Sequence, residues 1–90
     1  LKYQYILALQ AYNQIDFNKT IEITTSIIEN YNMEFEWLKG FAYFLRAKSY
    51  DLMGQRILAI DDYNQVFIMD DFYPEVGLAR EYIKKPFSLN

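Results

Sequence analysis

The stretch that decides the fold is LRAKSYDLMGQRILAIDDYNQVF, residues 45–67. Ala47 and Ala59 lie twelve positions apart on either side of Gly54, a residue that suits the left-handed conformation found after a helix. Small residues at this spacing let two antiparallel helices approach closely where they cross. The stretch therefore predicts a helix–turn–helix hairpin.

The same pattern occurs 39 positions earlier in the chain, where Ala8 corresponds to Ala47 and Thr20 to Ala59. The positions that follow also correspond: Ile21 with Ile60, Thr24 with Tyr63, Ile27 with Val66 and Ile28 with Phe67. Self-similarity at a fixed period is typical of repeated structural units. The sequence therefore predicts two consecutive hairpins.

Apolar residues recur at helical spacing through five segments, and we expect helices over residues 2–13, 18–31, 34–53, 56–69 and 75–85. The β-branched run from Ile21 to Ile28 could indicate a strand, but strict alternation fails within it, so we predict a helix there too. Asp16 or Asn18 is expected to cap this helix. Pro74 and Glu75 suit the start of the last helix, and Pro86 its end.

The composition excludes several classes of protein. The 90 residues are 52% hydrophobic and carry a net charge of −3, which argues against disorder. They include no His and no Cys, which removes the usual general base, thiolate nucleophiles and the commonest metal ligands. Asp61, Asp62, Asp70 and Asp71 are expected to form a solvated face and helix ends rather than a cation site. We expect no enzyme activity, no cofactor and no metal.

Two partner classes are also excluded. The one basic cluster is Arg80, Lys84 and Lys85, which fits the end of a helix better than a nucleic-acid surface. The longest uncharged stretch, Tyr3 to Ile15, is too short to span a membrane and contains four amide side chains. We therefore expect neither nucleic acid nor a membrane as a partner.

With these residues in view, the chain resembles the tetratricopeptide repeat (TPR) family. The second unit carries the resemblance through Ala47, Tyr50, Gly54, Ala59 and Tyr63, and Leu7–Ala8 matches the large–small pair in the first unit. The chain departs from the family at Arg46, Ala11, Ile15 and Asp71, and its period is 39 rather than about 34. It is a degenerate, TPR-like pair.

The resemblance implies an all-α fold in which antiparallel hairpins stack as a short right-handed α-solenoid of five helices. One domain would cover residues 1–90, divided into a first pair (1–33), a second pair (34–71), a capping helix (74–86) and a tail (87–90). The chain begins at Leu1 within an amphipathic pattern and without a capping residue, so we expect a fragment of a longer protein.

The resemblance also implies a function, since the first helices of TPR pairs line a concave groove that holds a peptide or a partner helix. The positions carried over to this groove are Lys2, Tyr5, Leu9, Tyr12 and Asn13 in the first unit, and Phe41, Phe44, Lys48, Asp51 and Leu52 in the second. Tyr5, Leu9 and Leu45 stand where chaperone-tail receptors carry Lys and Asn, which argues against that subtype.

Two questions stay open on the sequence alone. The aromatic residues can be core rather than groove, in which case the chain is a structural domain that packs on its parent chain, forms a homo-oligomer, or is appended to a catalytic protein. Arg46 has no acid three or four positions away in its own helix, so it can stack on Tyr43 or Tyr50, reach solvent, or contact the parent chain.

Overall fold

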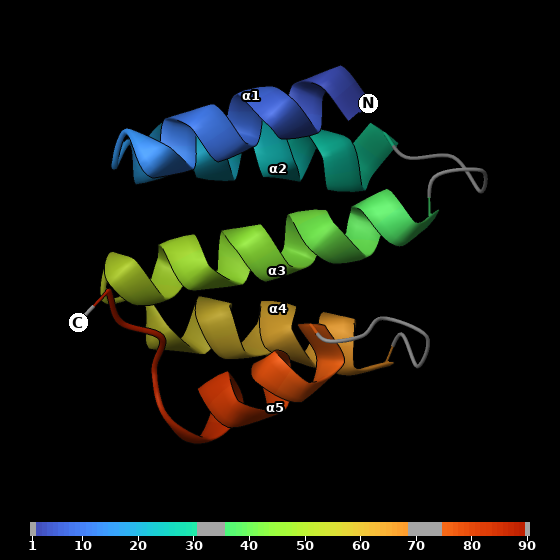
Figure 1. Cartoon of the computed structure of the whole chain (residues 1–90). Helices are drawn as coiled ribbons and strands as arrows, with labels where there is room; N and C mark the ends of the chain where they lie inside the picture. The colour runs from blue at the N-terminus through green and yellow to red at the C-terminus, as the bar shows by residue number, and fades with distance from the viewer. Residues whose placement is uncertain (1, 31–35, 69–74, 90) are drawn as a thin grey trace.

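The computed structural model of the chain describes residues 2–30, 36–68 and 75–89. It contains five α-helices: α1 (Lys2–Asn13), α2 (Phe17–Asn30), α3 (Glu36–Leu52), α4 (Arg56–Ile68) and α5 (Glu75–Lys84) (Figure 1). The described residues form no strand, so the prediction of an all-α fold with five helices is confirmed. The predicted roles of Asp70, Asp71 and Pro74 lie outside the described residues.

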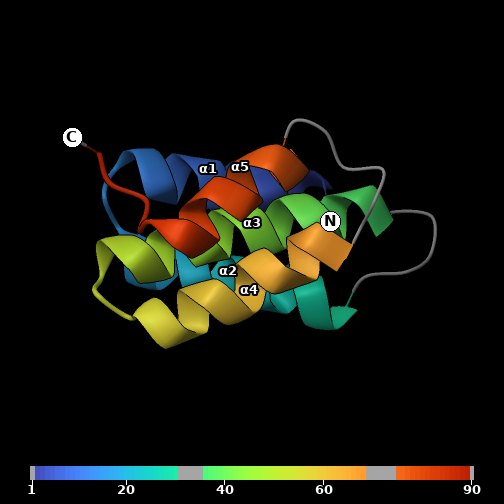
Figure 2. The same cartoon turned by 90° about the horizontal axis from the view of Figure 1, so that it is seen from below.

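The five helices are arranged around α3. Helices α1 and α2 pack as one antiparallel hairpin, α3 and α4 as a second, and α5 lies against α4 and α3. Helix α3 contacts the other four helices, whereas α2 and α4 have no close backbone contact with each other among the described residues. Figure 2 shows α1 and α5 on one side of the molecule and α2 and α4 on the other.

The two hairpin turns have the same hydrogen bonds. In the second turn, the N–H of Gln55 donates to the carbonyl of Tyr50 at 2.8 Å, and in the first, the N–H of Asp16 donates to that of Ala11 at 2.9 Å. Gly54 has a φ of 78°, as predicted for a left-handed cap, and Ile15 at the matching position has a φ of 62°. A β-branched residue is strained in this region, so the first turn adopts the glycine conformation without a glycine.

The start of α2 explains how its β-branched sequence forms a helix. Asp16 is the capping residue, because its Oδ1 accepts a hydrogen bond from the N–H of Lys19 at 3.2 Å. Within α2, the hydroxyl of Thr24 donates to the carbonyl of Thr20 at 2.7 Å, which satisfies a polar group that is buried. The helix therefore accommodates its threonines through local hydrogen bonds.

The core lies at the predicted crossings of the helices. Ala8, Thr20, Ala47 and Ala59 are all completely buried. A larger cluster joins α3, α4 and α5 around Tyr63 and Phe44, and a smaller one joins α2 and α3 through Ile27, Leu38 and Ala42. Tyr63 is completely buried in the larger cluster, whereas Phe67 is 39% exposed, one position after the buried Val66.

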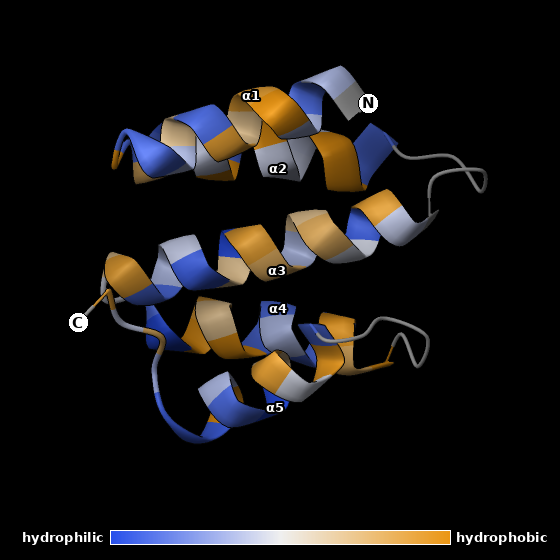
Figure 3. Ribbon diagram, viewed as in Figure 1, coloured by the Kyte–Doolittle hydropathy of each residue, from blue (hydrophilic) through white to orange (hydrophobic). Residues whose placement is uncertain are grey.

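Apolar residues are not confined to this core. Figure 3 shows hydrophobic positions on all five helices. On α1, Tyr3 and Ile6 are 71% and 52% exposed, although their counterparts 39 positions later, Ala42 and Leu45, are buried. No helix within the described residues is long and apolar enough to cross a bilayer.

The close crossing at Ala59 gives a direct test of the helix register. Replacing Ala59 with Arg should lower the free energy of unfolding by at least about 3 kcal/mol, because a long cation is forced into a filled interior. The same substitution at Ile57, an exposed residue of the same helix, should change it by less than about 0.5 kcal/mol. Urea denaturation of both variants measures the difference, and equal stabilities would show that the register is wrong.

Candidate functional site

Helices α1, α3 and α5 run in the same direction (Figure 1), and α1 and α5 flank α3 on the side away from α2 and α4, so the three helices share this side of the molecule (Figure 2). We call it the inner face. The rings of Tyr5 and Phe41 lie 5.8 Å apart near its beginning, and the ammonium of Lys48 lies 5.1 Å from the ring of Tyr12 near its end. Phe44 and Tyr82 stack at 6.0 Å, which joins α3 to α5. The inner face therefore brings together most of the groove residues predicted from the sequence.

The residues of α1 are the more accessible part of the predicted set. Tyr5, Leu9 and Tyr12 are half-buried, and Asn13 is exposed. Burial raises the pKa of Tyr5 to about 12, and the negative charge of Glu75 on α5 adds to this effect. Burial likewise raises the pKa of Tyr12. Both phenols are therefore neutral near pH 7 and offer a ring edge and a hydroxyl rather than a charge.

The residues of α3 divide into two kinds. Phe41 is half-buried between Tyr5 and Trp37, whose ring meets it edge-on at 6.0 Å. Phe44 is buried and belongs to the larger core cluster, where it also meets the ring of Tyr63 at 6.2 Å. Phe44 therefore serves mainly to hold α3, α4 and α5 together.

Lys48 lies among aromatic rings. Its ammonium is 5.1 Å from the ring of Tyr12, 5.0 Å from that of Phe44 and 5.2 Å from that of Phe87, distances at which a cation is attracted to a ring face. Desolvation lowers the pKa of Lys48, while the charge of Glu75 opposes this shift. Sequence analysis did not single out Phe87, because no helical pattern continues beyond Pro86.

Asp51 is the centre of a buried network at the end of α3. Its carboxylate, which is fully buried, accepts hydrogen bonds from Arg56 at 3.0 Å, from the hydroxyl of Tyr63 at 2.8 Å and from the backbone N–H of Phe87 at 3.0 Å. Burial, followed by the bond to Asp51, raises the pKa of Tyr63. The expected groove residue Asp51 is thus engaged by three groups of its own chain through four hydrogen bonds, since one nitrogen of Arg56 contacts both carboxylate oxygens.

Arg56 extends this network to α5. Its second terminal nitrogen donates to the carbonyl of Ile83 at 2.7 Å and to that of Tyr82. Carbonyls in the last turn of a helix lack partners within the helix, so this arginine supplies the bonds that end α5. The signal in the sequence is an acid and an arginine on either side of Gly54, but their link to α5 depends on the packing.

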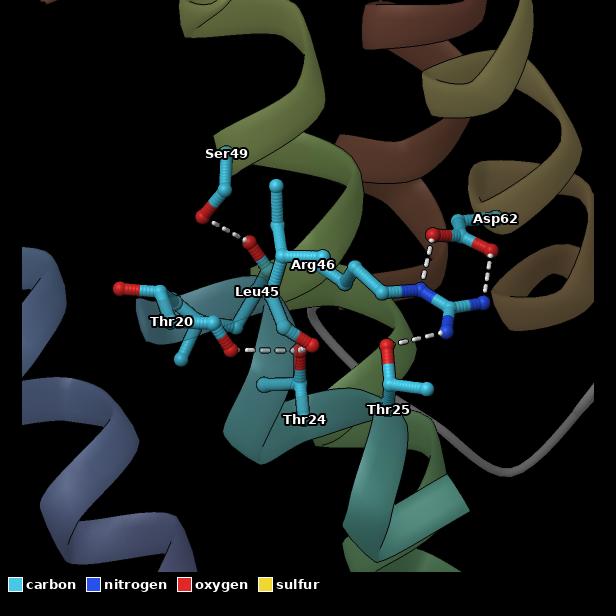
Figure 4. A network of polar contacts seen from close by, with 8 residues as sticks. Thr20, Thr24, Thr25, Leu45, Arg46, Ser49 and Asp62 are labelled. Atoms are coloured by element: carbon cyan, nitrogen blue, oxygen red, sulfur yellow. Dashed lines mark hydrogen bonds and ion pairs between the residues drawn. The ribbon is translucent and has the colours of Figure 1, made fainter. Parts of the chain in front are cut away.

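Arg46, the charge without a local partner, forms an ion pair with the next helix (Figure 4). Its guanidinium donates two hydrogen bonds to the carboxylate of Asp62, at 2.7 and 2.8 Å, and a third to the hydroxyl of Thr25 at 3.0 Å. It also lies 5.5 Å from the ring of Tyr43 and 5.8 Å from that of Tyr50, which agrees with stacking, one of the alternatives that the sequence left open. Arg46 therefore joins α2, α3 and α4.

This pair corrects the prediction that both Asp61 and Asp62 lie on a solvated face. Asp61 is exposed, but Asp62 is only 4% exposed. Burial raises the pKa of Asp62, because the loss of water outweighs the opposing effect of Arg46. The acid that pairs with Arg46 lies sixteen positions away, beyond the three or four positions that separate neighbours within one helix.

The acidic residues do not converge. Within the part of the chain that the structure describes, no group of three or more acids is placed to hold a metal ion. The polar groups brought together on the inner face are instead hydrogen-bonded carboxylates, phenols and an ammonium.

Comparison with known proteins adds no relative: no family model, no curated protein and no solved structure matches the chain.

The buried ion pair between Arg46 and Asp62 can be tested by mutation, with the neighbouring Asp61 as a control. Replacing Asp62 with Ala should cost about 3–5 kcal/mol of stability, because it leaves the guanidinium of Arg46 buried without its counter-ion. Replacing the exposed Asp61 with Ala should cost less than about 0.5 kcal/mol. Replacing Arg46 with Met and Asp62 with Leu together should restore most of the loss. Chemical denaturation measures all three, and a small loss for Asp62→Ala would contradict the assigned pair.

Proposed function

We propose that this chain is a TPR-like protein-interaction module, in which two hairpins and a capping helix stack as a short right-handed α-solenoid and bind a peptide or a partner helix on the inner face. The matched turns and matched buried positions, 39 residues apart, support the repeat. The parallel course of α1, α3 and α5 supports the choice of face.

The observation that carries the proposal is the partial exposure of uncharged, ring-bearing residues along α1 and α3 on this face. Tyr5, Tyr12 and Phe41 are half-buried, and Leu9 lies between the two tyrosines on the same helix. Such side chains give a large contact area at low entropic cost, because their rings turn about few bonds. Contacts with neighbouring side chains already hold these rings in place before a partner binds.

The predicted groove residues then divide into two roles. Tyr5, Leu9, Tyr12, Asn13 and Phe41 form the contact set. Phe44 and Asp51 build the face from within, because one is in the core and the carboxylate of the other is fully buried. Lys48 lies between these two sets, and its ammonium sets the orientation of a partner.

Two charge-matched variants test this proposal. Replacing Leu9 with Asp should remove partner capture in a pull-down, because a carboxylate would have to be desolvated on contact. Replacing Asn64 with Asp, an exposed position on α4, should leave capture intact. Circular dichroism checks that both variants are folded, and Asn13→Arg, at an exposed site, replaces Leu9→Asp if that variant unfolds. Capture that survives both inner-face changes would refute the proposal.

A second function, self-association or packing on the parent chain, is favoured by one observation. Tyr3 and Ile6 are exposed on α1 at the positions where α3 carries Ala42 and Leu45, which are buried. A helix placed on α1 as α2 is placed on α3 would cover them. The mass of the protein in solution separates the two functions, since a stable dimer that Ile6→Glu dissociates would favour this second one.

A further inference from the structure

The segment after α5 returns to the inner face. Pro86 lacks the N–H that a further helical turn would need, and the chain then runs from the end of α5 toward the end of α3 (Figure 1). A hollow of about 250 Å³ lies beside this segment and is lined by Glu81, Tyr82, Lys85, Pro86, Phe87 and Ser88. This segment thus lies against the inner face, where Phe87 contacts Tyr82 and Lys48.

Phe87 holds this segment to the helices through three contacts. The ring of Phe87 meets that of Tyr82 at 5.1 Å and lies 5.2 Å from the ammonium of Lys48, and its N–H donates to Asp51 at 3.0 Å. Phe87 is half-buried, whereas Pro86 is exposed and Leu89 is 61% exposed. The contacts of Phe87 thus combine one aromatic ring and one backbone donor.

The site that receives Phe87 is built without the segment. Tyr12, Phe44, Lys48 and Tyr82 come from α1, α3 and α5, and Phe44 stacks on Tyr82 independently of Phe87. The carboxylate of Asp51 is fixed by Arg56 and Tyr63. With Phe87 withdrawn, this site would offer the ring of Tyr82 to another ring, the ammonium of Lys48 to a ring face, and the carboxylate of Asp51 to a backbone N–H.

We propose that this site, formed by Tyr12, Phe44, Lys48, Asp51 and Tyr82, binds an aromatic residue of a partner peptide, and that Phe87 fills it from within the same chain until the partner displaces it. The inference rests on the proposed function and names the partner's chemistry: an extended segment with a phenylalanine-like ring and a free backbone N–H at the same residue. Neither requirement involves a charge on the partner.

Because Phe87 occupies the site, it lowers the affinity of the chain for an external peptide. Phe87 is tethered three positions beyond the end of α5, so it competes as if it were present at a high local concentration. A partner therefore binds the intact chain with an affinity reduced by the fraction of molecules in which Phe87 is displaced. Removing the ring of Phe87 should increase the affinity for an external peptide without altering the site itself.

The experiment uses the chain's own segment as the probe. An acetylated and amidated peptide of sequence KPFSL, residues 85–89, is titrated into the Phe87→Ala chain and into the unchanged chain while the amide signals of Lys48 and Asp51 are followed by NMR. We expect saturable shifts in Phe87→Ala, with a Kd at least tenfold lower than in the unchanged chain. The peptide KPASL should cause no saturable shift.

Two further variants test whether tighter peptide binding comes from loss of the Phe87 ring rather than from a general change in the fold. Leu89→Ala, at an exposed position of the same segment, should bind the peptide as weakly as the unchanged chain. Phe87→Leu, which keeps apolar volume but loses the ring, takes the place of Phe87→Ala if that variant is unfolded. An absence of saturable shifts in a folded Phe87 variant, or equal Kd values with and without the ring, would overturn the inference.

The outcome is distinguishable from failure of the proposed function. If KPFSL does not bind but Leu9→Asp still removes partner capture, the inner face binds partners and the Phe87 site is not part of it. If KPFSL binds as expected but Leu9→Asp has no effect, the site exists and the larger groove does not.

Discussion

The buried carboxylate of Asp51 lies 3.0 Å from the guanidinium of Arg56, across the turn between α3 and α4. A carboxylate with no exposure to water requires a close counter-ion and further donors, and Tyr63 and Phe87 supply the latter. Arg56 in turn has nitrogens left for the last carbonyls of α5. The second hairpin, α5 and the segment after it thus share one ion pair, and the end of the inner face takes its shape from it.

The ion pair between Arg46 and Asp62 also joins separate helices. Arg46 binds Asp62 and Thr25, and so links α2 to α4 although those helices have no close backbone contact within the described residues. In the first hairpin, the positions that match Asp51 and Arg56 hold Tyr12 and Phe17, whose rings lie 5.7 Å apart. The same turn is therefore closed by an aromatic pair in one hairpin and by an ion pair in the other.

Much of the fold could be predicted from the sequence, because small residues at Ala8, Ala47 and Ala59 and the glycine at Gly54 are local signals of close crossings and of a turn. The ion pairs could not be predicted, since Arg46 and Asp62 meet only when two helices have packed. Asp61 and Asp62 look alike in the sequence, and the rotation of α4 decides which one is buried. Phe87 was missed for a different reason: no periodicity governs a residue after Pro86, and its place is fixed by Tyr82, Lys48 and Asp51.

The central claim is that the ion pair between Asp51 and Arg56 holds α5 and the following segment on the second hairpin. Amide hydrogen exchange of the Arg56→Met variant tests it most directly, because exchange reports the opening of separate parts of a fold. The account predicts that amides of α5 exchange faster by on the order of tenfold or more, while those of α1 and α2 keep their protection. Unchanged protection in α5, or an equal loss in all five helices, would contradict it.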